Sequence, residues 1–182
     1  MSFVRRGPLA RTDGCRRRLW PSAPPPRPRL RAAVVELQDR ERLLHPTRLP
    51  GGRVADAYLE WMLRRAGAAG AAGAVLVAES GGEFAGFVAG WVEQAGNIGE
   101  TPDSNRFGHV SDICVMPAFR GRRIAGLLLE AIERHLRRAG VTRLRVNALA
   151  ANAPARASYE RAGFAPYEVL HEKVVVDAGG DA

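Results

Sequence analysis

The chain of 182 residues is long enough for one domain with a substantial core, and its 46% hydrophobic content is ordinary for a globular protein. Its net charge of +8 lies at the start of the chain, because residues 1–31 hold nine arginines and one acidic residue while the remainder is neutral. The charge therefore does not indicate a nucleic-acid-binding domain. No apolar run approaches the ~20 residues of a membrane-spanning helix. The scattered His and Cys residues have no metal-ligand spacing.

The N-terminal segment differs in composition from the rest of the chain. Residues 1–28 are rich in arginine and proline and have little apolar surface to bury, which predicts disorder. We therefore expect an ordered domain over 29–177 and a flexible C-terminus over 178–182. The arginine-rich start lacks the apolar stretch of a secretory signal, and Cys15 and Cys114 lie in contexts too different to indicate a disulfide. These features predict a cytoplasmic protein with reduced thiols.

The apolar pattern predicts the elements of the domain in chain order. The first half is expected to contain a strand over 30–37, a short helix over 38–44, an amphipathic helix over 52–65, a loop over 66–73 and a hairpin within 74–92 that turns at Ser80-Gly81-Gly82. The second half is expected to contain a strand over 109–115, a helix over 121–138, a strand over 144–148, a helix over 154–161 and closing strands over 164–170 and 172–176. This order indicates an α/β (α+β) fold around one sheet.

The strand, Arg-Gly turn and helix within residues 109–136 suggest an anion site. Small residues at Gly121, Ala125 and Gly126 leave room beside the free N–H groups of the helix start, and Arg120 and Arg122 add positive charge. The pyrophosphate of a nucleotide-type cofactor is the anion that such a turn suits best. Taken alone the string is weak evidence, because Arg, Gly and Ala are common throughout the chain and a surface helix has the same composition.

A second pattern, Asn-x-x-Ala-x-x-x-Tyr-x-x-x-Gly-Phe, covers residues 152–164. Together with the string Arg120-Gly121-Arg122-Arg123-Ile124-Ala125, it resembles the two cofactor motifs of the GNAT superfamily of acetyl-CoA-dependent N-acetyltransferases. The resemblance extends over residues 29–176. Arg120, Ile124 and Ala125 match the first motif, whereas Arg123 stands where the middle glycine of the family is commonest.

The resemblance implies a mixed, mostly antiparallel, twisted sheet of six to seven strands with helices on both faces. It also implies acetyl-CoA as co-substrate, with no metal. In this family a splayed strand and the second motif bind the pantetheine arm, and the turn binds the pyrophosphate. The residues thereby expected to contact the cofactor are Ile113, Cys114, Val115, Arg120, Gly121, Arg122, Arg123, Ile124, Ala125, Gly126, Asn152 and Tyr159. Cys114 is expected to be a plain buried thiol and not a nucleophile.

The implied reaction is direct transfer of an acetyl group to a primary amine. Tyr159 is expected to act as the general acid for the departing thiolate, a role that suits a phenol with a pKa of about 10. The alternative is that Tyr159 only packs on the core. Asp112 is expected to be the catalytic base, and His109 and Glu93 stay open as alternatives.

The acceptor is expected to be a small-molecule or peptide amine, with neither a specific nucleic acid nor a membrane as partner. Tyr58, Trp61 and Trp91 are candidates for its pocket, although Trp61 lies on an apolar helix face typical of core. A homodimer is compatible with the resemblance. Two other functions stay open, namely a non-catalytic acyl-CoA-binding regulatory domain of the same fold and nucleic-acid binding by the arginine-rich tail. The presence of Tyr159 favours catalysis over a non-catalytic acyl-CoA-binding domain. The neutral charge of the chain after residue 31 argues against nucleic-acid binding as its function.

Overall fold

The computed structural model of the chain describes residues 15–19 and 27–175. Their strands form one sheet in the order β1-β2-β3-β4-β5, in which β4 and β5 are parallel and the other pairs are antiparallel. The strands are β1 (Cys15–Leu19), β2 (Gly73–Ser80), β3 (Glu83–Gln94), β4 (Arg106–Val115) and β5 (Leu144–Val146). The helices are α1 (Arg27–Arg42), α2 (Gly51–Ala68), α3 (Pro102–Asn105), α4 (Ile124–Arg137) and α5 (Ala153–Arg161), with 3₁₀ turns at Gly70–Ala72 and Pro117–Phe119.

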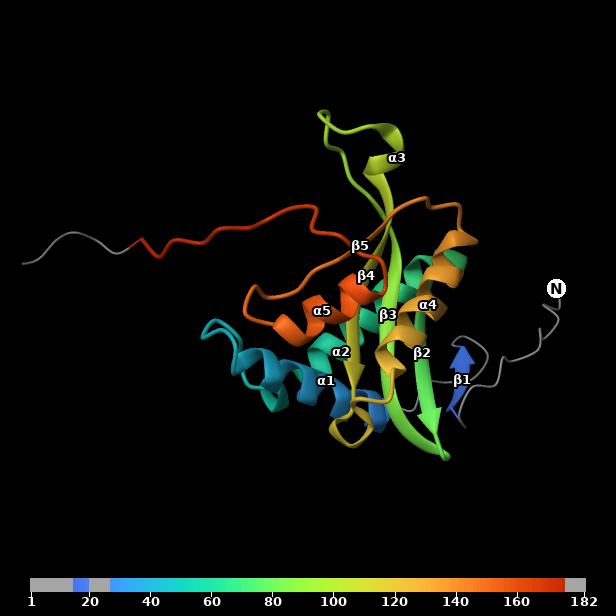
Figure 1. Cartoon of the computed structure of the whole chain (residues 1–182), viewed down its shortest axis with the longest axis vertical. Helices are drawn as coiled ribbons and strands as arrows, with labels where there is room; N and C mark the ends of the chain where they lie inside the picture. The colour runs from blue at the N-terminus through green and yellow to red at the C-terminus, as the bar shows by residue number, and fades with distance from the viewer. Residues whose placement is uncertain (1–14, 20–26, 176–182) are drawn as a thin grey trace, which may run out of the picture.

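Helices cover both faces of this sheet, as the sequence predicts (Figure 1). On one face α1 and α2 form a core with the sheet that includes Leu30, Met62 and Phe87. On the other face α4 places Leu128 and Ile132 against the strands, because its apolar residues recur on one helical stripe. The mixed sheet with helices on both faces is therefore confirmed.

Residues 30–37 form part of α1, so the strand predicted there is wrong. Leu30, Ala33 and Val34 are buried and Leu37 is partly buried, which is the i, i+3, i+4, i+7 spacing of a helix that packs along one stripe. The apolar run alone is compatible with either element. The burial of this stripe against α2 and the sheet shows that the segment is a helix. The helix predicted over 38–44 is the end of the same helix, α1.

The prediction of six to seven strands is also wrong. Four strands, β2 to β5, lie within 29–177, and β1 is added by the N-terminal segment. No residue between 147 and 175 is in a strand, and residue 176 lies outside the described part. A strand needs a neighbour for its backbone groups, whereas residues 165–175 leave the body of the protein as an extended C-terminal arm (Figure 1).

The other predicted elements are present with shifted ends. The hairpin turns at Gly81 and Gly82 as expected, and both glycines have positive φ angles, 60° and 87°. The segment predicted as a loop over 66–73 instead contains the end of α2 and a 3₁₀ turn. β1 lies within the first 28 residues, where the composition predicts disorder, and pairs with the free edge of β2. The rest of residues 1–26 lies outside the described part.

A β-bulge in β4 determines where its second half points. Val110 lies opposite Gly90 and Asp112 lies opposite Ala89, so Ser111 is an extra residue in β4. In a regular strand Val110 and Asp112, which are two residues apart, would point to the same face. Instead Val110 is in the core under α4, whereas Asp112 reaches a side chain of α2 on the opposite face.

Candidate active site

A cleft of about 1480 Å³ lies where α1, the second half of β4, the start of α4 and α5 meet. Asp112, Tyr159 and every residue predicted to contact the cofactor line this one cleft. These residues are Asp112, Ile113, Cys114, Val115, Arg120, Gly121, Arg122, Arg123, Ile124, Ala125, Gly126, Asn152 and Tyr159. His109 and Glu93 are not among its lining residues. The structure therefore brings together the two sequence motifs, which lie about thirty residues apart in the chain.

The start of α4 presents unpaired backbone donors to the cleft. The amides of Ile124, Ala125 and Gly126 belong to the first helical turn, where no intrahelical carbonyl is available, and no side chain caps this end. At Gly121 and Gly126 an added Cβ would meet no atom within 4 Å, so open space adjoins the backbone. Free N–H groups beside open space, together with the positive end of the helix dipole, suit an anion.

Arg123 precedes α4 in a left-handed conformation, with φ 58° and ψ 13°. It is the one non-glycine residue with a positive φ in the described ranges 15–19 and 27–175. This is the position where the family motif most often has glycine. An L-residue in this region is strained by about 1–2 kcal/mol. The backbone thus keeps the shape that glycine would adopt freely, and an arginine side chain is attached to it.

The three arginines of the turn have different partners. Arg120 donates to the Glu36 carboxylate at 2.6 Å and to the Val115 carbonyl at 3.2 Å. The guanidinium of Arg122 lies over the Phe119 ring, 5.4 Å from its centroid. The Arg123 side chain is exposed and has no partner within the part of the chain that the structure describes. Its full charge is therefore available at the cleft.

The neighbouring strands separate beside the cleft. β5 pairs with β4 only from Gly108 to Val110, and the ladder ends before the bulge at Ser111. On its other edge β4 continues to pair with β3 as far as Val115. Within the described ranges no strand therefore pairs with this edge of β4 after Val110, and the segment lines the cleft, where it can accept an extended ligand as a further strand.

α5 places Asn152 and Tyr159 in the cleft. The side-chain oxygen of Asn152 accepts a hydrogen bond from the Ala155 amide at 3.3 Å, so this residue caps the helix. The ring of Tyr159 packs near Phe164, and its hydroxyl has no hydrogen-bond partner within residues 27–175. Burial raises the pKa of Tyr159 to about 12, with the charges of Glu41 and Asp112 adding to the shift. The hydroxyl is therefore protonated at neutral pH and able to donate.

Asp112 is nearly fully buried, and both carboxylate oxygens have partners. The Tyr58 hydroxyl of α2 donates to Oδ1 at 2.8 Å, and the Ser111 hydroxyl donates to Oδ2 at 2.6 Å. Burial raises the pKa of Asp112 although these two hydrogen bonds oppose the shift. The Asp112 carboxylate is thus fixed in position by two hydrogen bonds, and it lines the cleft.

The two other candidate bases lie away from the cleft. Burial lowers the pKa of His109, whose ring lies 5.8 Å from that of Trp91. The Glu93 carboxylate accepts hydrogen bonds from Arg65 and Trp91, which lower its pKa against the effect of burial. Of the three candidates only Asp112 adjoins the space that the two motifs enclose.

The residues predicted to line the acceptor pocket differ in how close they lie to the cleft. Tyr58 approaches the site through its bond to Asp112. Trp61 contacts the edge of Trp91 and is 40% exposed, so it is not fully buried core. Cys114 is a free, buried thiol whose pKa burial raises to about 12, which fits the inert thiol predicted for it.

Glu41 is a cleft residue that the sequence analysis missed. It lies near the end of α1 and lines the cleft together with Leu37 and Arg40. The mistaken strand over 30–37 hid it, because it separated residue 41 from the helix that carries it to the site. Continuing the helical stripe of Leu30, Val34 and Leu37 by four residues leads to Glu41 and was the available signal.

Two kinds of site are not found in the described part of the chain. Among residues 15–19 and 27–175 no group of three His, Cys, Asp or Glu side chains is placed to hold a metal ion. None of the helices described there has the length and apolarity that crossing a membrane requires.

The chain belongs to the acetyltransferase (GNAT) family, whose profile matches residues 32–164. No curated protein matches the chain in sequence. The fold is shared with glucosamine-6-phosphate N-acetyltransferase from Arabidopsis thaliana, at 17% identity over 88% of this chain and 97% of that chain, with a TM-score of 0.56.

Two further solved structures have the same fold. The aminoglycoside N-acetyltransferase AAC(6')-Iy in complex with CoA is 18% identical over 92% of this chain and 98% of that chain, with a TM-score of 0.61. A GCN5-related N-acetyltransferase from Ralstonia eutropha JMP134 is 18% identical over 88% of this chain and 97% of that chain, with a TM-score of 0.63. At these identities the likeness is one of fold.

Proposed function

We propose that this chain is an N-acetyltransferase that moves the acetyl group of acetyl-CoA directly to a primary amine. One observation carries the proposal: the unpaired amides at the start of α4 and the unpaired hydroxyl of Tyr159 open into the same cleft. The first group suits an anion, and the second suits a leaving group that needs a proton. The family membership and the CoA complex of the related fold support the same cofactor.

The polar groups that line the cleft suit the parts of acetyl-CoA. The α4 amides, with Gly121, Arg122 and Arg123, would hold the pyrophosphate. The free edge of β4 at Ile113, Cys114 and Val115 would hold the pantetheine arm. When bound, acetyl-CoA supplies a thioester whose carbonyl carbon accepts an amine.

The protein groups divide the proton transfers between them. A backbone N–H near Val115 would polarise the thioester carbonyl. Tyr159, kept protonated by its raised pKa, would donate its proton to the departing thiolate. Asp112 lines the same cleft, and its negative charge would favour a cationic acceptor. In this proposal Asn152 would contact the pantetheine arm with the part of its amide that does not cap α5.

The acceptor is proposed to be a small-molecule or peptide amine. The related folds support this class, since one is a glucosamine-6-phosphate N-acetyltransferase and another an aminoglycoside N-acetyltransferase. We further propose a cytoplasmic, homodimeric enzyme with no nucleic-acid or membrane partner. The catalytic domain is proposed to span residues 29–177, with residues 178–182 as a short tail, and the arginine-rich residues 1–28 are proposed to contribute no residue to the site although they add β1 to the sheet.

The first test is calorimetric titration of acetyl-CoA and of CoA into the full chain. We expect one-to-one binding of both ligands. Tyr159→Phe should then keep the acetyl-CoA affinity and lower kcat about 100-fold or more on a panel of primary amines that includes kanamycin and glucosamine 6-phosphate. Tyr167→Phe is the matched control, because Tyr167 lies on the C-terminal arm and donates to Glu100 at 2.6 Å. Absence of acetyl-CoA binding, or equal rates for the two variants, would reject the proposal.

A non-catalytic acyl-CoA-binding domain is the second candidate. The burial of Asp112 and its two internal donors favour this reading, because such a carboxylate has little freedom to exchange protons with a substrate. This function predicts tight acetyl-CoA binding with no transfer to any amine of the panel.

A further inference from the structure

Glu41 enters the cleft from a different wall than the residues of the two motifs. It is carried by α1, whereas Asp112 comes from β4 and Tyr159 from α5, and all three side chains line the same space. The charges of Glu41 and Asp112 both act on Tyr159, so the unpaired hydroxyl lies within the electrostatic reach of two carboxylates. An acceptor that approaches the Tyr159 hydroxyl therefore meets the charge of both carboxylates.

Charged side chains of both signs line the cleft. Arg122 and Arg123 belong to the turn before α4, where the cofactor phosphates are proposed to bind, and Arg40, Arg120 and Arg161 also line the cleft. Glu41 from α1 and Asp112 from β4 are the carboxylates whose charges act on the Tyr159 hydroxyl, whereas Glu130 and Glu133 belong to α4. Two carboxylates within electrostatic reach of Tyr159 favour a cationic ligand beside that hydroxyl.

The two carboxylates differ in what they can still accept. Both oxygens of Asp112 receive hydrogen bonds from hydroxyl groups of the protein, and the residue is 6% exposed. Glu41 pairs through Oε2 with Arg48 at 3.1 Å, while Oε1 has no partner within the described ranges. Glu41 therefore has a free acceptor oxygen at the cleft, and Asp112 has none.

We propose that Glu41 is the carboxylate that receives the ammonium group of the acceptor and takes its proton, and that the acceptor is accordingly a cationic amine. This inference rests on the transferase function proposed above. Asp112 then acts as a fixed negative charge near Glu41. In this proposal none of the candidate bases named from the sequence, Asp112, His109 and Glu93, takes the proton of the ammonium.

The protons balance over one turnover. Glu41 accepts one proton from the ammonium, which frees the nitrogen lone pair to form the C–N bond. As the C–S bond breaks, Tyr159 gives its proton to the sulfur. The nitrogen, acidic once it is bonded to the acyl carbon, returns a proton to the Tyr159 phenolate. Glu41 finally releases its proton to water, which accounts for the one proton that the reaction produces.

The surroundings of Glu41 suit this role. Burial raises its pKa, the Arg48 guanidinium opposes that shift, and the charge of Asp112 adds to it. Tyr58 from α2 and Tyr159 from α5 are the other titratable groups that its charge affects. A base is more effective when its pKa is closer to the working pH, so the net rise favours proton transfer.

The test compares Glu41→Gln with Glu60→Gln in the full chain. Glu60 is the matched control because it pairs with Arg27 on the exposed surface of α2, outside the cleft. The probes are the cationic amines kanamycin, spermidine and L-lysine, and the uncharged arylamine 4-methylaniline. We expect transfer to at least one cationic probe and a loss of about 100-fold or more in kcat/KM for Glu41→Gln alone, with an unchanged Kd for acetyl-CoA.

Arg48→Gln supplies a readout that a merely structural role would not change. Glu41 must be ionised to accept the proton, so kcat/KM falls as the pH drops through its pKa. Removing the Arg48 charge raises that pKa further, and the acidic limb of the profile should move to higher pH. Glu41→Asp should restore part of the activity and keeps the test valid if Glu41→Gln does not fold.

Each outcome decides between the proposals. Acetyl-CoA binding followed by transfer only to 4-methylaniline, or by equal activity of the Glu41 and Glu60 variants, overturns the role of Glu41 and leaves the transferase function in place. An unmoved pH profile in Arg48→Gln also overturns it. Failure to bind acetyl-CoA overturns the transferase function itself, and the role of Glu41 with it.

Discussion

Arg123 combines a strained backbone with a free charge at the mouth of the cleft. Its left-handed conformation is disfavoured for a residue with a Cβ, and glycine adopts it freely. We predict that Arg123→Gly raises the free energy of unfolding by about 1 kcal/mol, the relief of strain exceeding the added entropy of the unfolded chain. The same variant should bind acetyl-CoA more weakly because one unpaired cation is lost. Urea unfolding and calorimetry measure the two effects.

Arg123→Ala separates strain from charge. Alanine removes the guanidinium but keeps the Cβ, so this variant should lose acetyl-CoA affinity without the gain in stability. Equal unfolding free energies for the glycine and alanine variants would show that the turn is not strained. Equal affinities of both variants and the parent chain would show that the Arg123 charge does not act on the cofactor.

At the scale of elements, α1 gives a sharp test because helix and strand predict different buried residues. In a strand Leu30, Ala32 and Val34 would share a face, whereas in the helix Ala33 is fully buried and Ala32 is exposed. We predict that Ala33→Asp lowers the free energy of unfolding by about 3 kcal/mol or more, because it buries an unpaired charge. Ala32→Asp should change it by less than about 0.5 kcal/mol. Urea unfolding of the two variants measures both, and the reverse ranking would restore the strand.

The elements that the sequence predicted correctly are those with local signals. The hairpin has Gly81 and Gly82 at its turn, and α4 has apolar residues at every fourth position. The gathering of the proposed cofactor residues in one cleft was also predictable, since these residues lie in two contiguous motifs. The segments 30–37 and 164–175 were not, because an apolar run fits either element until its packing partner is known.

The acceptor side of the site depends on contacts between distant segments. Tyr58 meets Asp112 across 54 residues of sequence, and Glu41 reaches the cleft only because α1 packs against the sheet. The bulge at Ser111, which turns Asp112 toward α2, has no signal in the composition of β4. These features arise from tertiary packing, which a periodicity of side chains along one segment cannot specify.

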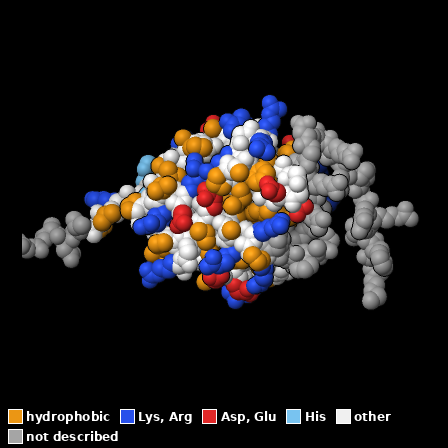
Figure 2. Space-filling view, turned by 90° about the horizontal axis from the view of Figure 1, so that it is seen from below, with side chains coloured by type: hydrophobic (Ala, Val, Ile, Leu, Met, Phe, Trp, Pro, Cys, Tyr) orange, Lys and Arg blue, Asp and Glu red, His pale blue; other side chains and the backbone are white. Residues whose placement is uncertain are grey.

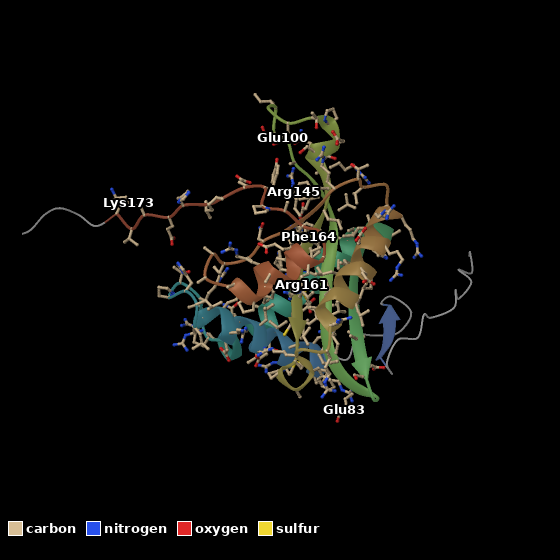
Figure 3. The ribbon with its side chains drawn as sticks, viewed as in Figure 1. Glu83, Glu100, Arg145, Arg161, Phe164 and Lys173 are labelled. Carbon is tan, nitrogen blue, oxygen red and sulfur yellow. The ribbon has the colours of Figure 1, made fainter. Side chains whose placement is uncertain are left out.

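At the scale of the whole molecule, the C-terminal arm is the main departure from a closed surface. Its root is fixed by Arg145, which lies over the Tyr167 ring, and by the bond from Tyr167 to Glu100 (Figure 3). Beyond this root the arm carries hydrophobic side chains into solvent (Figure 2). Its exposed large hydrophobic residues are Tyr167, Val169, Leu170, Val174 and Val175. Such a concentration of apolar surface is typical of an interaction site.

The arm and the short β5 suggest how two copies would associate. β5 has three residues and pairs on one side with β4, and no other strand among residues 15–19 and 27–175 pairs with its other edge, which can therefore receive an extended segment. We predict that the full chain sediments as a dimer at micromolar concentration, and that Leu170→Glu combined with Val174→Glu shifts it to monomer by placing charges in the contact. Leu43→Glu is the control, because Leu43 is 87% exposed at the end of α1 and is not itself part of the arm, which meets this region through the ion pair of Glu172 with His45.

Sedimentation velocity over a tenfold range of concentration distinguishes the outcomes. A monomeric parent chain at every concentration would show that the arm does not join two copies. A dimer that survives both charges but is lost with Leu43→Glu would place the interface at α1 instead. If the arm variant is monomeric and still binds acetyl-CoA with the parent affinity, the interface is independent of the cofactor side of the cleft. That result is expected, because no arm residue beyond Tyr167 is among the residues that line the cleft.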